Sequence, residues 1–262
     1  MLSLSGLSKN FGGLQVLQNV TLTIPERAIV GLIGPNGAGK TTVFNLITGL
    51  LVPAKGTIEL FGRLLNGMPP YQITRCGVAR TFQNIRIFKE MSVLENVLVA
   101  LRPSHDYNPG RAFLSLRGLH DSRPREEEAA LELLRRVSLI DMVAQPAGTL
   151  SYGAQRRLEI ARALATSPKL LLLDEPAAGM NPVEKQQLMD EIVNLHQSGL
   201  GVLLIEHDMS FVMGLCKQII VMNFGQVIAA GSPEEIRQNP RVIEAYLGRD
   251  DETNPTVSQP RS

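Results

Sequence analysis

The chain has 262 residues, of which 44% are hydrophobic and 19% are charged. This balance excludes a largely disordered protein and allows a sizeable core in one large domain or two modest ones. Lys and Arg number 26 against 25 Asp and Glu, so the overall charge argues against nucleic-acid binding unless a local basic patch provides it.

The sequence contains only two cysteines, Cys76 and Cys216, and neither has a second Cys or a His at metal-ligand spacing. We expect two structural thiols in a reducing compartment. Residues Met1–Lys9 lack the basic stretch and apolar run of an export signal. Apolar runs such as Leu170–Leu173 stop far short of the ~20 residues of a membrane-spanning helix, so we expect membrane association only through a protein partner.

Short β-branched runs alternate with helical segments along the chain, which is typical of an α/β fold. Several of these runs are apolar at consecutive positions, as expected for a largely parallel sheet that helices cover on both faces. The expected strands are Thr21–Ile24, Ala28–Ile33, Thr57–Leu60, Leu170–Leu173, Gly201–Ile205 and Gln218–Met222.

A glycine-rich segment, Gly34-Pro35-Asn36-Gly37-Ala38-Gly39-Lys40-Thr41, follows the strand Ala28–Ile33 and precedes a helical run, Thr42–Thr48. It fits the GxxxxGK(S/T) pattern in the structural context that this pattern requires. The glycines let backbone N–H groups converge on phosphate oxygens, and the positive end of the following helix points at them. Lys40 adds a charge for the β and γ phosphates, and Thr41 offers a hydroxyl to Mg²⁺.

Between Lys89 and Ala165 the sequence indicates a helical insert, with Leu131, Leu134 and Val137 on one face of an amphipathic segment. Within it, residues 102–124 are rich in Pro, Gly, His and Arg and are predicted to be a loop-rich excursion. Residues 249–262 are polar with two prolines, and we expect a mobile tail there.

Two carboxylates, Asp174 and Glu175, come directly after the apolar strand Leu170–Leu173. A charge at the end of a buried strand needs a partner, and opposite a phosphate loop that partner is Mg²⁺ for Asp174. Glu175 is then placed to act as general base toward the attacking water. A surface acidic pair is the alternative interpretation.

The segment Leu150-Ser151-Tyr152-Gly153-Ala154-Gln155 lies before that strand and opens the helical run Arg156–Ala165. Ser151 and the Gly153 amide at a helix start indicate a second anion site, although a simple Ser N-cap is an equal alternative. With this segment, the chain resembles the nucleotide-binding subunits of ABC transporters along nearly its whole length, the tail excepted. The family consensus is Ser-Gly-Gly-Gln, so Tyr152 and Ala154 are departures.

The resemblance implies a P-loop NTPase of ABC ATPase type, with a mostly parallel core sheet, an antiparallel β portion and an inserted helical subdomain. The expected division is an ATP-binding core at residues 1–88 and 166–248, the helical subdomain at 89–165 and the tail at 249–262. ATP and Mg²⁺ are the implied ligands. The implied nucleotide contacts are Phe11, Val16, Gly34, Asn36, Gly37, Ala38, Gly39, Lys40, Thr41, Thr42, Ser151, Gly153, Gln155 and Asn181.

The resemblance also implies three catalytic residues, Glu175, Gln83 and His207, and the metal ligands Thr41, Gln83 and Asp174. Gln83, after the strand-like Val78–Phe82, matches the glutamine that senses Mg²⁺ and water, and His207 matches the histidine at the γ phosphate.

A purely structural role is the alternative for several of these residues. His207 is also typical of a structural histidine at a strand end, and Phe11 of edge packing rather than adenine stacking. Asn181, before Pro182, fits a helix N-cap.

A narrower resemblance points to the ATPases of branched-chain (hydrophobic) amino-acid uptake systems. It rests on residues 150–165, 174–182 and the ending from Gly231 through Gly248. It implies a head-to-tail pairing with an identical or paralogous ATP-binding subunit, transmembrane permease subunits, an extracytoplasmic substrate-binding protein and no nucleic acid, at the cytoplasmic side of the inner membrane. The alternatives are another cargo, such as urea or lipid, and a non-transport ABC ATPase.

Overall fold

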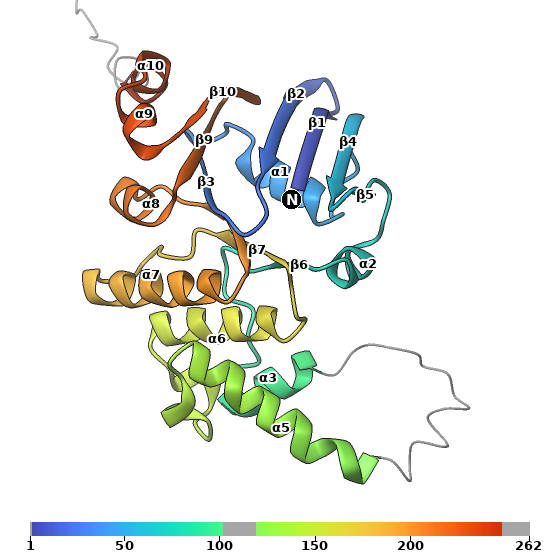
Figure 1. Ribbon diagram of the computed structural model, residues 1–262, viewed down its shortest axis with the longest axis vertical. Helices are drawn as coiled ribbons and strands as arrows, with labels where there is room; N and C mark the ends of the chain where they lie inside the picture. The colour runs from blue at the N-terminus through green and yellow to red at the C-terminus, as the bar shows by residue number, and fades with distance from the viewer. Residues whose placement is uncertain (1, 102–118, 248–262) are drawn as a thin grey trace, which may run out of the picture.

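Two β-sheets and a group of helices make up residues 2–101 and 119–247, the part of the chain that the computed structural model describes (Figure 1). The strands are β1 (Leu2–Phe11), β2 (Leu14–Ile24), β3 (Ile29–Ile33), β4 (Lys55–Leu60), β5 (Arg63–Leu64), β6 (Val78–Arg80), β7 (Leu170–Asp174), β8 (Gly201–Ile205), β9 (Gln218–Asn223) and β10 (Gln226–Gly231). The α-helices are α1 (Lys40–Ile47), α2 (Pro70–Arg75), α3 (Val93–Leu101), α5 (Leu119–Arg136), α6 (Tyr152–Leu164), α7 (Pro182–Gln197), α8 (Met209–Leu215), α9 (Pro233–Arg237) and α10 (Pro240–Leu247). Short 3₁₀ turns occupy Ile140–Met142 and Ala147–Thr149.

The larger sheet has the strand order β10-β9-β3-β8-β7-β6, and its pairs are parallel except for the antiparallel pair β10–β9. All residues of β3, β7 and β8 are buried, as the consecutive apolar runs predicted. Because the strands are parallel, the carboxyl ends of β3, β7 and β8 meet at one edge, and that edge carries the site.

A second sheet, in the order β2-β1-β4-β5, is antiparallel. One apolar cluster joins Leu4 and Ile58 of this sheet, Phe44 and Ile47 of α1, and Leu32 of β3. Helix α1 therefore lies between the two sheets. The strands β1, β5 and β10 were not among the expected strands.

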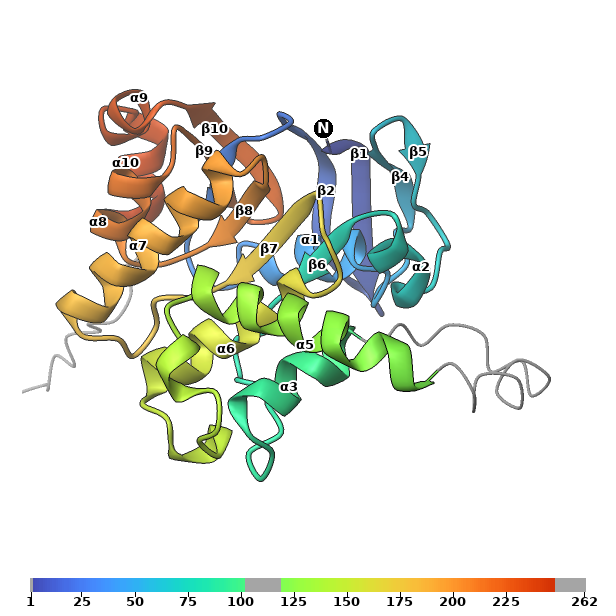
Figure 2. The same cartoon turned by 60° about the horizontal axis from the view of Figure 1, so that its bottom comes forward.

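The helices α3, α5 and α6 pack together beside the larger sheet (Figure 2). On the amphipathic segment Leu134 and Val137 are buried as expected, while Leu131 is half-buried. The predicted loop at 102–124 is wrong at its end, because α5 begins at Leu119 and contains Pro124. A proline inside a helix removes one backbone hydrogen bond and its ring clashes with the preceding turn, so proline normally argues against a helix and the composition misplaced this boundary.

Residues 102–118 of that predicted loop and the predicted tail at 249–262 lie outside the described residues. In the described ranges, no helix combines the length and apolar character needed to cross a bilayer. Both cysteines are free thiols, and burial raises the pKa of Cys216 to about 12.

Candidate functional site

The phosphate loop, Gly34–Thr41, turns from the end of β3 into α1 as the sequence predicted. Gly34 has φ 147°, and a Cβ there would lie 2.0 Å from the Met222 carbonyl oxygen. Gly39, at the N-cap of α1, is left-handed with φ 99°. Both positions exclude a side chain, so the glycine pattern reflects a real backbone requirement.

A hollow of about 200 Å³ opens over this loop. Its walls are the loop and the start of α1 on one side and two predicted catalytic residues on the other. The lining residues are Val16, Asn36, Gly37, Ala38, Gly39, Lys40, Thr41, Thr42, Glu175 and His207. The structure thus brings together most of the predicted nucleotide contacts.

Lys40 is 6% exposed and lies within the loop. Its Nζ donates to the carbonyl oxygens of Gly34 at 2.6 Å and Pro35 at 3.0 Å. The loop carbonyls thus hold the ammonium beside the hollow. A phosphate placed there would meet this charge together with the amino end of α1.

The three predicted catalytic residues meet at one carboxylate. Glu175 Oε2 accepts a hydrogen bond from Gln83 Nε2 at 2.9 Å, and Glu175 Oε1 lies 2.9 Å from His207 Nε2. Glu175 follows the last residue of β7 and has φ 49°, a backbone conformation that costs free energy for a residue other than glycine. The fold therefore holds this carboxylate in a strained position at the rim of the hollow.

Asp174 is buried beneath the site and paired with an arginine that the sequence analysis missed. Arg80 Nη2 lies 2.7 Å from Asp174 Oδ2, and both side chains are 5% exposed. Arg80 also donates to Asn45 Oδ1 at 2.7 Å and lies near the rings of Phe44 and Phe82. The available signal was a charged residue in the middle of the strand-like Val78–Phe82 run.

Glu206 is a second residue that sequence reasoning missed. Its carboxylate is 3% exposed and accepts from the backbone N–H of Ala177 at 2.7 Å and of His207 at 3.0 Å. Burial raises the pKa of the carboxyl group. Glu206 therefore joins the segment after Glu175 to the one carrying His207, and the signal for it was a glutamate continuing an apolar strand.

Four other predicted contacts do not line the hollow. Ser151 is the N-cap of α6 and accepts from the Ala154 N–H at 3.3 Å, and Gln155 donates to the Leu150 carbonyl at 3.0 Å. A Cβ on Gly153 would lie 2.7 Å from Glu184 Oε1.

Asn181, the fourth of these contacts, caps α7. Its Oδ1 accepts from the N–H groups of Val183 and Glu184 at 2.9 and 3.0 Å, and its own N–H donates to Glu184 at 3.1 Å. In this structure Ser151 and Asn181 therefore act as helix caps. A single chain can show only this role, because the alternative role needs nucleotide held by a second subunit.

Phe11, at the end of β1, is 46% exposed and does not line the hollow. The ammonium of Lys9 lies 5.4 Å from the centre of its ring. Gly34, Gln83 and Asp174 also lie outside the lining, Gly34 within the backbone turn and Asp174 in its ion pair with Arg80.

The proposed metal ligands Thr41, Gln83 and Asp174 are all oxygen donors, the class that Mg²⁺ prefers. Among the described residues, no group of three or more His, Cys, Asp or Glu side chains could hold a metal ion by itself. The donor set therefore fits an ion that is held jointly with phosphate oxygens and water.

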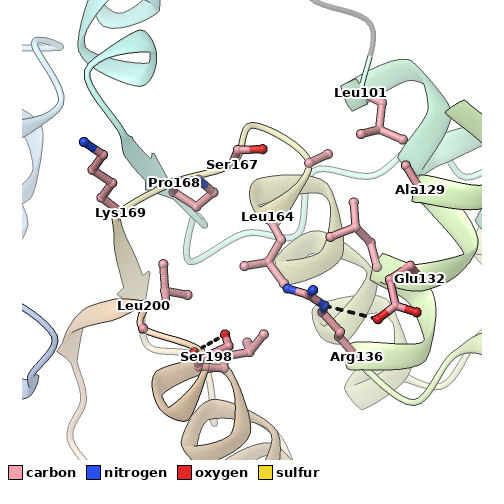
Figure 3. Close-up of a pocket in the computed structure, with 14 residues that line it drawn as sticks. Leu101, Ala129, Glu132, Arg136, Leu164, Ser167, Pro168, Lys169, Ser198 and Leu200 are labelled. Atoms are coloured by element: carbon pink, nitrogen blue, oxygen red, sulfur yellow. Dashed lines mark hydrogen bonds and ion pairs between the residues drawn. The ribbon is translucent and has the colours of Figure 1, made fainter. Parts of the chain in front are cut away.

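A separate hollow of about 450 Å³ lies between α5, the end of α6 with the segment that follows it, and the end of α7 with the turn before β8 (Figure 3). Arg136 and Glu132 form an ion pair at 3.5 Å in its wall, and Leu164 and Leu200 contribute apolar lining. None of the predicted site residues lines it.

Comparisons with known proteins agree with the family resemblance. The family model described as "ABC transporter" matches residues 17–178, and "Branched-chain amino acid ATP-binding cassette transporter" matches 226–252. The high-affinity branched-chain amino acid transport ATP-binding protein LivG of Salmonella typhimurium is 48% identical over 95% of this chain and 98% of its own. BraF of Pseudomonas aeruginosa, of the same description, is 47% identical over the same shares. The lipopolysaccharide export ATP-binding protein LptB of Haemophilus influenzae is 33% identical over 95% and 97%.

Solved structures agree as well. A nucleotide-free ATP-binding cassette from an ABC transporter superposes with a TM-score of 0.82 at 31% identity, over 95% of this chain and 99% of that one. A dimeric post-hydrolysis cassette bound to ADP and Pi gives a TM-score of 0.73 at 25% identity, over 89% and 99%. With its P-loop fold and its phosphate-binding turn, the chain belongs to the ABC transporter family and is one of that family's ATP-hydrolysing cassettes.

Proposed function

We propose that the chain hydrolyses Mg²⁺-ATP in a head-to-tail pair of cassettes and so powers the uptake of branched-chain amino acids through a membrane permease. The observation that carries this proposal is the meeting of Glu175 with Gln83 and His207 at the rim of the phosphate-loop hollow.

The phosphate loop binds the triphosphate. Backbone N–H groups between Asn36 and Thr42 converge on the hollow, and Lys40 places its ammonium against the β and γ phosphates. Phe11 and Val16 contact the adenine in this proposal, and Val16 lines the hollow. Thr41, Asp174 and Gln83 are the residues that would hold a Mg²⁺ ion, which would supply positive charge beside the phosphate oxygens.

Glu175 is the general base. Its carboxylate lies one residue beyond Asp174 and faces the hollow, where a water attacking the γ phosphate is within its reach. Gln83 and His207 orient the carboxylate through contacts of 2.9 Å each. His207 also lines the hollow, so it can exchange this contact for one with the γ phosphate.

The second half of the site comes from another subunit. The sequence contains one phosphate loop and one Ser151 segment, and Ser151, Gly153, Gln155 and Asn181 do not line this chain's own hollow. The similarity to a dimeric cassette supports a pair in which the Ser151 edge of one copy closes on the phosphate loop of the other. Bound nucleotide contacts both surfaces and shifts the population toward the closed pair.

The cargo assignment is supported by the relatives. Identity is 48% to a branched-chain amino acid transport protein and 33% to a lipopolysaccharide export protein, over nearly the same share of the chain. Transmembrane permease subunits and an extracytoplasmic binding protein select the cargo, and the cassette lies at the cytoplasmic side of the inner membrane. Nucleic acid has no part in this function.

Two variants test the hydrolytic core of the proposal. Glu175→Gln is expected to retain ATP binding, to lose turnover by about 10²–10⁴-fold and to accumulate an ATP-bound dimer in size-exclusion chromatography. Lys40→Ala is expected to lose nucleotide binding. Wild-type turnover in Glu175→Gln would remove the base assignment. Uptake of labelled leucine and of urea, measured in a deletion strain and its complemented control, tests the cargo, and urea uptake alone would overturn the amino-acid assignment.

A further inference from the structure

Helix α6 holds the backbone on both sides of Gln83. Arg156, on the second turn of α6, is 0% exposed. It donates to the Phe82 carbonyl at 2.5 Å and to the Gln83 carbonyl at 2.8 Å. Glu159, one turn later, accepts from the N–H of Phe82 at 3.4 Å and of Arg86 at 3.3 Å. Side chains of α6 therefore hydrogen-bond to both the backbone N–H groups and the backbone carbonyls of the segment 82–86.

Arg156 and Glu159 are themselves paired, with Nη1 2.9 Å from Oε2 and side-chain exposures of 0% and 7%. Burial raises the pKa of the Glu159 carboxyl group, and the neighbouring Arg156 opposes that rise. A buried ion pair contributes little net stability compared with apolar side chains of the same volume. The contribution of the Arg156–Glu159 pair is the geometry that it imposes on the backbone of residues 82–86.

Tyr152 connects Arg156 to the segment after β7. Its hydroxyl accepts from Arg156 Nη2 at 3.3 Å, and a Cβ on Gly179 would lie 3.4 Å from its ring. The residue that replaces a consensus glycine in the Ser151 segment therefore hydrogen-bonds to Arg156 and lies beside Gly179, in the stretch between Glu175 and Asn181.

We propose that Arg156 and Glu159 are positioning residues that fix Gln83, and through it the Glu175 carboxylate, to the helix that begins at Ser151. Tyr152 extends this arrangement to its neighbour Gly179. This inference rests on the proposed function, because it assumes that Gln83 and Glu175 act on the nucleotide. Its consequence is that the geometry of the base follows the position of α6, so that hydrolysis responds to closure of the Ser151 edge on a partner subunit.

Arg156→Gln is compared with Arg157→Gln. Arg157 is the next residue on α6, but it contacts Gln187 and Glu191 of α7 instead of the segment 82–86. We expect both variants to lower the melting temperature. Arg156→Gln is expected to lower kcat at least tenfold with a KM for Mg²⁺-ATP within threefold of wild type, whereas Arg157→Gln keeps the wild-type kcat. Equal kcat losses in the two variants would reduce Arg156 to a structural role and overturn the proposal.

A double-mutant cycle with Gln83→Ala shows whether Arg156 acts through Gln83. In the Gln83→Ala background, Arg156→Gln is expected to lower kcat less than twofold further, and multiplicative losses would overturn the proposal. If Arg156→Gln does not fold, Glu159→Gln replaces it in the same cycle. Failure of the proposed function itself would be visible separately, as a Gln83→Ala variant with wild-type turnover.

A measurement without nucleotide tests the hydrogen bonds between α6 and the segment 82–86 separately from catalysis. Amide hydrogen exchange at Phe82 and Arg86 reports local opening of these two N–H groups. We expect at least tenfold faster exchange in Glu159→Gln and unchanged exchange in Arg157→Gln. Unchanged exchange in Glu159→Gln would show that the carboxylate does not hold this segment.

Discussion

Replacing Arg80 with methionine isolates the buried pair beneath the site. Arg80 and Asp174 lie 2.7 Å apart with both side chains 5% exposed, so Arg80→Met leaves the carboxylate buried without its cation. Removing one partner of a buried ion pair costs about 3–5 kcal/mol. Methionine keeps much of the packing near Phe44 and Phe82, so most of the loss comes from the unpaired charge.

The assay is urea unfolding of nucleotide-free protein in a double-mutant cycle. In an Asp174→Asn background the carboxylate charge is gone and Arg80 is itself the unpaired buried charge. Arg80→Met removes that charge there, so it is expected to cost no more than about 1 kcal/mol, the contribution of the lost hydrogen bond to Asn45. The cycle should therefore show a coupling free energy of about 2–4 kcal/mol between positions 80 and 174. Additive effects, or a loss below about 1 kcal/mol in Arg80→Met alone, would refute the assignment of Arg80 as the counter-ion of Asp174.

Three further predictions concern the surroundings of the site. Gly153→Ala would displace the Glu184 carboxylate from its hydrogen bond with the Asn181 N–H. In thermal unfolding, Gly153→Ala and Glu184→Ala should therefore show a coupling free energy of about 1 kcal/mol. Additive effects of the two substitutions would contradict this. Gly34→Ala, with its Cβ 2.0 Å from a carbonyl oxygen, should abolish nucleotide binding in a fluorescence titration, and wild-type affinity would show that the turn relaxes freely. Burial raises the pKa of Glu191 above its usual 4.5, so the ionised carboxylate lowers the free energy of unfolding at neutral pH. The stability of the wild type relative to Glu191→Gln should therefore rise as the pH falls from 7 toward 4.5. A stability difference that is independent of pH would contradict the burial penalty.

Local backbone chemistry made the phosphate loop predictable. The glycines at 34 and 39 are required by the turn itself, so their spacing carries the information without any knowledge of distant contacts. Glu175 and His207 meet because they follow neighbouring parallel strands, β7 and β8, and the carboxyl ends of such strands share an edge. An α/β reading of the sequence therefore brings these two residues together in advance.

Contacts between segments far apart in the sequence were not predictable in this way. Arg80 lies 94 residues before its partner Asp174, and only the pairing of β6 with β7 places them side by side. The long strand β1 escaped prediction because its pairing with β2 is irregular between Leu4 and Asn10 and it contains a left-handed Gly6. Such irregularities break the alternation by which a strand is recognised.

Mixing two inactive variants tests most directly whether the phosphate loop of one copy is completed by the Ser151 edge of another. Lys40→Ala removes the phosphate-binding charge, and Ser151→Arg blocks the opposing edge. A mixed pair keeps one site with both Lys40 and Ser151 intact, so the equimolar mixture should regain ATP turnover that neither variant shows alone. A mixture no more active than its separate components, with dimers present, would contradict the account.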